Sequence, residues 1–112
     1  MKTDVVEEAG RAVVTVTGSV DALTAPELAK TLSDQVQAGR ANLVVDLMGV
    51  EFMSSAGLRT LLGAVKETRS HGGDLRIASR NPGVDKVLKM SGFHTIAKVF
   101  PSQAEAIASF GS

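Results

Sequence analysis

The chain has 112 residues, with 12 basic and 12 acidic side chains that leave no net formal charge. This balance argues against a general electrostatic grip on nucleic acid or on an anionic membrane, and we expect neither as a direct partner. Because cysteine is absent, disulfides, thiol nucleophiles and thiolate metal sites are excluded. The length and a hydrophobic fraction of 44% are ordinary for a globular protein, so we expect one domain over residues 1–112.

The N-terminal part of the chain predicts a hairpin followed by a helix. Residues 3–6 and 12–17 are short strand-forming runs, the second strongly β-branched, and the turn between them makes an antiparallel pair. Thr24 and Glu27 have the spacing of a capping box, which predicts a helix start. Apolar residues then recur at helical spacing until Gly39, where the helix is expected to end.

The middle of the chain predicts a strand, a helix and another strand. Residues 41–47 form a largely apolar run, which is typical of a strand buried on both faces. A helix is predicted from Ser55 to about His71, because leucine and valine recur every three or four residues and two glycines follow. Residues 75–78 predict the next strand.

The C-terminal part predicts a helix capped by Asn81, a strand over residues 96–100, and a last helix. Ser102 and Glu105 form a second capping box at the start of that last helix. The resulting order is β-β-α-β-α-β-α-β-α. Strands that alternate with helices predict an α/β domain, with a mixed, mostly parallel sheet and about four helices packed on it.

Residues 46–58 join the buried strand to the middle helix and place two hydroxyls, Ser54 and Ser55, at the helix start. First-turn amides lack intrahelical acceptors and the helix dipole is positive at this end, so it can hold an anion. The other predicted helices begin with a conventional cap, whereas this one has no acidic residue in its first turn. The small Ala56 and Gly57 would let a neighbouring chain approach. A serine here either caps the helix or carries a phosphate, and the two alternatives imply different functions.

Residues 52–58 (Phe-Met-Ser-Ser-Ala-Gly-Leu) resemble the signature of the STAS domain, the fold of bacterial anti-sigma factor antagonists. That signature reads Asp-Ser-Ser/Thr-Gly-Leu after an apolar pair. Two further elements of the family are matched as well. One is residues 17–21 with the Thr-Ala pair at 24–25, and the other is residues 90–93. Together these segments span nearly the whole chain in the family's order. Two positions depart from the pattern: Ser54 stands where the family has Asp, and Ala56 stands where it has a hydroxyl residue.

The resemblance implies a phosphorylation switch at Ser55, with Ser54 as the alternative acceptor. In such a pathway the unphosphorylated antagonist binds an anti-sigma factor that is also an ATP-dependent serine kinase, which frees the client of that kinase. Phosphorylation releases the antagonist, and a PP2C-like, metal-dependent serine phosphatase resets it. The resemblance and the residues around the acceptor together suggest these partner-binding positions: Asp21, Thr24, Ser54, Ala56, Gly57, Arg59 and Lys66.

Several of these residues have simpler alternative roles. Asp21 could orient Ser55 or contact the kinase, but it could equally form an Asx turn before the first helix. Arg59 and Lys66 could be ordinary solvated charges on the exposed flank of the helix. Asp46 is expected to be structural and to bond loop amides at the end of its strand.

We expect no metal, cofactor or intrinsic catalysis. His71 and His94 lack acidic or sulfur ligands at metal spacing, and no nucleophile-elbow or Walker-type glycine pattern is present. Two alternatives to the antagonist stay open. One is a STAS module of a lipid-transport or stress-signalling assembly without a phospho-switch, and the other is a small α/β enzyme. The N-terminus is too polar for a signal peptide, so we expect a cytoplasmic protein.

Overall fold

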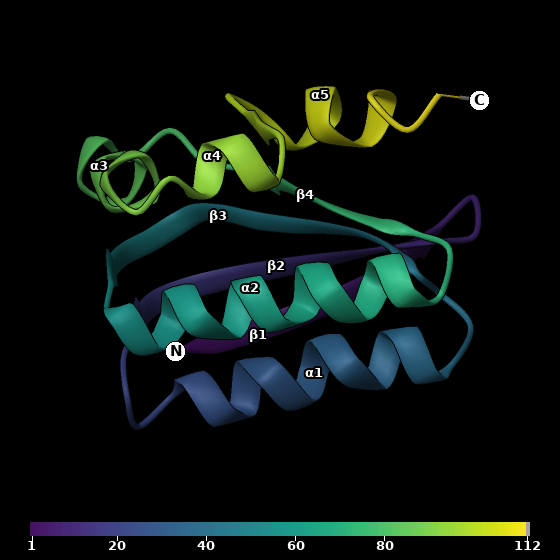
Figure 1. Ribbon diagram of the computed structural model, residues 1–112, viewed down its shortest axis with the longest axis horizontal. Helices are drawn as coiled ribbons and strands as arrows, with labels where there is room; N and C mark the ends of the chain where they lie inside the picture. Colours follow the sequence, from purple (N-terminus) through teal and green to yellow (C-terminus); the bar gives the residue numbers. More distant parts are fainter. Residues whose placement is uncertain (112) are drawn as a thin grey trace.

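Five strands form one mixed sheet at the centre of the molecule, which a computed structural model describes over residues 1–111 (Figure 1). The strands lie side by side in chain order. β1 is antiparallel to β2, and all other neighbours are parallel. Their bounds are Lys2–Glu8 for β1, Arg11–Val20 for β2, Asn42–Met53 for β3, Asp74–Ala78 for β4 and Val99–Phe100 for β5.

Helices follow every strand except β1. They are α1 (Ala25–Gln37), α2 (Ser55–Ser70), α3 (Pro82–Met90), the single turn α4 (Phe93–Ile96) and α5 (Gln103–Ala108). α1 and α2 lie side by side on one side of the sheet, and α5 lies on the other (Figure 1). The predicted α/β class and the predicted order of elements are confirmed, with α4 as an additional short helix before β5.

The alternation of side chains along β2 and β3 divides the core between the two faces of the sheet. Val14 and Val45 belong to a large core that α1 and α2 cover and to which α3 and α4 also contribute. Val13 and Val44 belong to a smaller core, where they pack with Ala106 of α5. The central strands are therefore buried on both faces, as the apolar run at 41–47 predicts.

β2 and β3 extend beyond their predicted ends at residues 17 and 47. They pair in parallel as far as Val20 and Met53, with register shifts after Thr15 and after Gly18. Glycine weakens an isolated strand, but Gly18 adopts a φ of +91°, and such freedom helps a strand pass through an irregular register. The backbone partners of these residues lie in the neighbouring strand, so local sequence could not reveal the extension. Because the two strands pair up to Val20 and Met53, the start of α2 lies next to the end of β2.

The prediction of a strand over 96–100 was wrong in its first part, because only Val99–Phe100 form β5. Ile96 instead ends α4, in which Thr95 donates its backbone N–H and its hydroxyl to the Gly92 carbonyl at 3.0 and 2.6 Å. Ala97 and Lys98 belong to no helix or strand. Phe93, at the start of α4, is 1% exposed and sits in the larger core. Burial of this aromatic ring favours a helical turn over an extended chain.

Candidate functional site

The end of β2 and the start of α2 are joined by a backbone hydrogen bond, from the Ser54 N–H to the Val20 carbonyl at 2.9 Å. This bond holds the loop after β2 beside the first turn of α2. Ligand sites of α/β proteins gather at the carboxyl ends of parallel strands, and both β2 and β3 end here. The candidate site is therefore built on this edge of the sheet.

Ser54 caps α2. It has extended backbone angles, and its hydroxyl oxygen accepts a long hydrogen bond, 3.4 Å, from the Gly57 N–H. An N-cap of this kind satisfies one of the first-turn amides that have no intrahelical acceptor. Of the two roles open to the serine pair, capping belongs to Ser54.

Ser55 is the first residue of α2, and its side chain is exposed. Within residues 1–111 its hydroxyl takes part in no side-chain hydrogen bond. The first turn of α2 contains no acidic residue, so the positive end of the helix dipole is not neutralised from within the helix. The arrangement offers a free nucleophilic hydroxyl at an electropositive position that is open to solvent.

Asp21 and Thr24 form a compact turn between β2 and α1. The Asp21 carboxylate accepts hydrogen bonds from the Leu23 and Thr24 N–H groups at 2.9 and 3.1 Å, which is an Asx turn. These amides, that of Thr24 foremost, hold the pKa of Asp21 below its ordinary value. The alternative structural role of Asp21 is therefore present in the fold.

The predicted capping box at Thr24 and Glu27 is wrong, although the helix does begin directly after Thr24. Thr24 has helical backbone angles and makes no side-chain cap hydrogen bond. Its hydroxyl instead accepts from the Asp21 N–H at 2.9 Å and lies 3.0 Å from the Ser19 carbonyl, to which it donates. The turn uses the hydroxyl that a capping box would need. Thr24 is a turn residue and is half-buried.

Gly57 is buried, so it offers no surface for a partner. An added Cβ would lie 2.8 Å from a methyl carbon of Val20 and 3.1 Å from Cγ of Met53. The glycine lets the first turn of α2 pack closely against the ends of β2 and β3. The segments that approach Gly57 therefore belong to this chain itself, not to a partner. Ala56 is half-buried and packs against the larger core.

Ser55, Arg59 and Lys66 are exposed and are spaced four and seven residues apart on α2. This spacing places them along one face of the helix. Neither cation takes part in a salt bridge in the described part of the chain. The phosphoacceptor candidate therefore lies at the end of a surface stripe that carries two positive charges.

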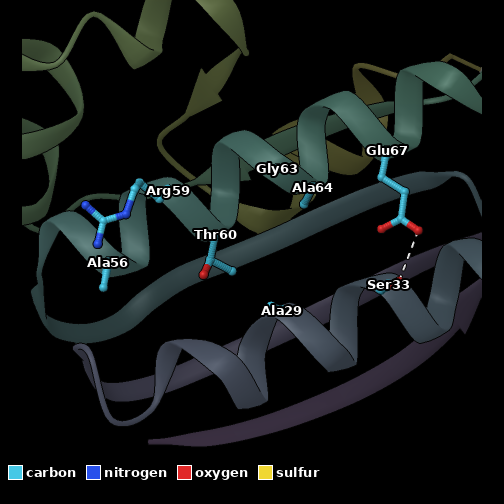
Figure 2. A pocket seen from close by; sticks show the side chains of 8 residues that line it. All are labelled: Ala29, Ser33, Ala56, Arg59, Thr60, Gly63, Ala64 and Glu67. Atoms are coloured by element: carbon cyan, nitrogen blue, oxygen red, sulfur yellow. Dashed lines mark hydrogen bonds between the residues drawn. The ribbon is translucent and has the colours of Figure 1, made fainter.

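A groove of about 470 Å³ runs between α1 and α2 (Figure 2). Arg59 lies towards the start of α2 and Glu67 towards its end, where Glu67 accepts a hydrogen bond from Ser33 of α1 at 3.0 Å. Small side chains make up most of the remaining lining: Ala29, Ala56, Gly63 and Ala64. Arg59 and Ala56 were predicted from the sequence as partner-binding residues, but the groove was not predicted. Small residues that recur at helical spacing on both helices are the feature of the sequence that could have indicated this groove.

Two exposed apolar side chains near Ser55 were also missed. Leu23, at the tip of the Asp21 turn, is 90% exposed, and Phe52, near the end of β3, is 55% exposed. Phe52 pairs with Ser19 in the β2–β3 ladder, so both apolar residues lie at the same edge of the sheet as Ser55. Alternation from the buried Val50 would place Phe52 inside, and the irregular register between β2 and β3 turns it outward, so strand periodicity gives no signal for it. We call Leu23, Phe52, Ser55 and Arg59 the Ser55 surface.

Asp46 is structural, as expected: one carboxylate oxygen accepts from the Met48 N–H and the other from the Gln103 side chain, both at 2.8 Å. Among residues 1–111 there is no group of three or more potential acidic, His or Cys ligands that could hold a metal ion. The described helices are all too short or too polar to cross a bilayer.

The chain is similar to known proteins in sequence and in fold. The family model of the STAS domain matches residues 2–106. BtrV of Bordetella bronchiseptica, named as an anti-sigma factor antagonist, is 35% identical over 101 residues, which cover 90% of this chain and 87% of BtrV. The anti-sigma F factor antagonist of Paenibacillus polymyxa is 27% identical over 99 residues, 88% of this chain and 85% of that protein. The crystal structure of an anti-sigma factor antagonist from Mycobacterium paratuberculosis superposes with a TM-score of 0.90 at 28% identity, covering 96% of this chain and 92% of the other.

Proposed function

Because this chain belongs to the STAS domain family, among the non-enzymatic anti-sigma factor antagonists, we propose that it is an antagonist switched by phosphorylation of Ser55. In its unphosphorylated form it binds an anti-sigma factor that is also an ATP-dependent serine kinase, and the client of that kinase is freed. Phosphorylation of Ser55 releases the antagonist, and a PP2C-like serine phosphatase restores it. The cycle takes place in the cytoplasm.

The observation that carries this proposal is the difference between two adjacent serines. Ser54 is engaged in capping α2, whereas Ser55 is exposed and its hydroxyl has no hydrogen-bond partner within residues 1–111. A kinase needs a hydroxyl that can enter its active site, and Ser55 meets that requirement without disturbing the helix start. This difference favours Ser55 over Ser54 as the acceptor.

Ser54 stands where the family pattern has Asp, and the geometry supports a reason why this substitution is tolerated. Serine and aspartate are both good N-cap residues, so Ser54 keeps the cap while removing a negative charge. A phosphate on Ser55 therefore meets no carboxylate on its immediate N-terminal neighbour. The free protein can accommodate the phosphate at the helix N-terminus with little change of fold.

The effect of phosphorylation falls on the complex. The phosphate adds about −1.5 to −2 charges at neutral pH, at the same end of the sheet as the exposed Leu23 and Phe52 side chains. These apolar side chains gain from burial against a partner, whereas a phosphate that the same partner covers must be desolvated. Loss of a few kcal/mol is enough to release a partner, because each 1.4 kcal/mol changes affinity about tenfold.

The direct test is phosphorylation by the cognate kinase, followed by intact-mass and peptide analysis. We expect one phosphate on the wild type, mapped to Ser55, and none on Ser55→Ala. The matched variant Ser54→Ala should still be phosphorylated, because it keeps the Ser55 hydroxyl. Phosphate on Ser54, or on a residue outside the Ser55 surface, would contradict the proposal. No phosphate at all would favour a STAS module without a phospho-switch.

Binding to the unmodified kinase tests the consequence of the switch. Ser55→Asp should weaken binding at least about tenfold, because a carboxylate mimics part of the phosphate charge. The control is Ser55→Asn, which has nearly the same shape without the charge and should bind more tightly than Ser55→Asp. Equal affinities of these two variants, measured by titration calorimetry, would show that charge at this position does not govern the complex.

A further inference from the structure

The outer edge of β1 is open along its whole length. β1 is the first strand of the sheet and pairs only with β2 within the described part of the chain. Six of its seven residues are exposed, including Val5 at 39% and Val6 at 57%. Such an edge offers unpaired backbone groups that can accept another strand.

The β1–β2 turn decides which backbone groups face this open edge. Ala9 and Gly10 both have positive φ, 53° and 78°, as a two-residue type I′ turn requires. That turn makes Glu8 and Arg11 a hydrogen-bonded pair, and hydrogen-bonded pairs alternate along an antiparallel ladder. The N–H and C=O groups of Thr3, Val5 and Glu7 consequently point away from β2.

Charge is distributed along β1 so that the strand complements itself when it is reversed. Lys2 lies at one end and Glu8 at the other, six residues apart and on the same face. In an antiparallel pair of β1 strands centred on Val5, each Lys2 lies opposite Glu8 of the other copy and the two Val5 side chains meet. In this register the outward-facing groups of Thr3, Val5 and Glu7 bond one another.

The neighbouring registers are less favourable. Directly opposed residues must lie on the same face, so the register can shift only by two residues at a time. A shift in one direction places Asp4 opposite Asp4 of the second copy. A shift in the other direction places Asp4 opposite Glu8. Like charges directly opposite each other destabilise a pair of strands, and of these three registers only the one centred on Val5 pairs every Lys2 with an acid.

We propose that the partner of this edge is a second copy of the same chain. The two β1 strands pair antiparallel about a two-fold axis at Val5, and the two sheets become one continuous sheet. This dimer uses an edge of the molecule that the Ser55 surface does not include. It is therefore independent of the proposed switch, which can fail without affecting it.

The test is a charge exchange on the chain of residues 1–112, purified without an N-terminal tag. Neither Lys2 nor Glu8 takes part in a salt bridge among residues 1–111, so both can be reversed without breaking an ion pair of the fold. Sedimentation equilibrium should show a concentration-dependent dimer for the wild type. In Lys2→Glu and in Glu8→Lys two attractive pairs become repulsive, and the dimer dissociation constant should rise about tenfold or more in each.

Mixing the two variants supplies the decisive control. A Lys2→Glu chain and a Glu8→Lys chain are complementary at both charged positions, so an equimolar mixture should dimerise about as well as the wild type. Circular dichroism of each variant verifies that the fold is retained. A wild type that remains monomeric up to millimolar concentration overturns the proposal. So do single variants that associate as the wild type does, or a mixture that stays monomeric.

Discussion

Ser54 and Ser55 have identical side chains, and their surroundings give them different roles. The Ser54 hydroxyl accepts from the Gly57 N–H, and its own N–H bonds the end of β2. The Ser55 side chain points into solvent at the first position of the helix. The capping role thus belongs to Ser54 and the proposed modification to the next residue, Ser55. Ser55 can therefore be altered without loss of the helix start.

This separation predicts that alanine destabilises the protein at Ser54 and has little effect at Ser55. Ser54→Ala removes the N-cap and should lower the free energy of unfolding by about 1 kcal/mol. Ser55→Ala removes no hydrogen bond and should change it by less than about 0.5 kcal/mol, as is usual for surface substitutions. Urea denaturation followed by circular dichroism measures both. Equal losses for the two variants would mean that capping is shared and that the serines are not distinct.

At the scale of the element, α2 uses small residues for two different purposes. Gly57 lies at the buried first turn, where Val20 and Met53 leave no space for a methyl group. Gly63 lies on the exposed side of the same helix, where an added Cβ would meet nothing within 4 Å. One glycine permits close packing of helix and sheet, and the other only costs helix stability.

Alanine substitution at these two glycines should therefore have effects of opposite sign. Gly57→Ala should destabilise the protein by about 1–3 kcal/mol, because the new methyl overlaps a packed core. Gly63→Ala should stabilise it by about 0.5–1 kcal/mol through helix propensity. Thermal unfolding of the two variants side by side measures this. A stabilising Gly57→Ala would show that α2 can move away from the sheet at no cost.

Helix starts were predicted well where one local side chain decides them. Asn81 and Ser102 cap α3 and α5 as expected, accepting from amides two and three residues ahead. The capping box predicted at Ser102 is only half formed, because the Glu105 carboxylate accepts from the Ser102 hydroxyl instead of its backbone N–H. Thr24 has the same local signal, but its hydroxyl bonds the Asp21 turn instead. A capping motif identifies a helix start reliably, whereas the bonds that its side chain makes depend on neighbouring structure.

At the scale of the whole molecule, the C-terminal segment is fastened to the sheet through Phe110. Its ring lies under the guanidinium groups of Arg76 and Arg11, 4.1 and 5.5 Å from its centroid. Arg76 also donates to Ser109 at 2.9 Å, and Arg11 donates to the Gly111 carbonyl at 2.6 Å. These contacts join the end of the chain to β2 and β4 over the smaller core.

Phe110→Ala should lower the free energy of unfolding by about 1–2 kcal/mol, from lost burial and lost cation–π contacts. Phe52→Ala is the matched control, because Phe52 is exposed and belongs to the Ser55 surface. It should leave stability nearly unchanged while weakening the proposed complex. A stable Phe110→Ala variant in urea denaturation would show that the C-terminal segment is not fastened by this ring.

The sequence by itself determined the class of the fold, the order of its main elements and the serine pair at the start of α2. Periodicity, caps and glycine stops are local signals, and each depends on residues close together in the chain. The tertiary structure decided the lengths of β2 and β3, the turn at residues 93–96, the burial of Gly57 and the exposure of Leu23 and Phe52. Each of these depends on hydrogen bonds or packing between residues distant in sequence, where local preference is outweighed by the partner that the fold supplies.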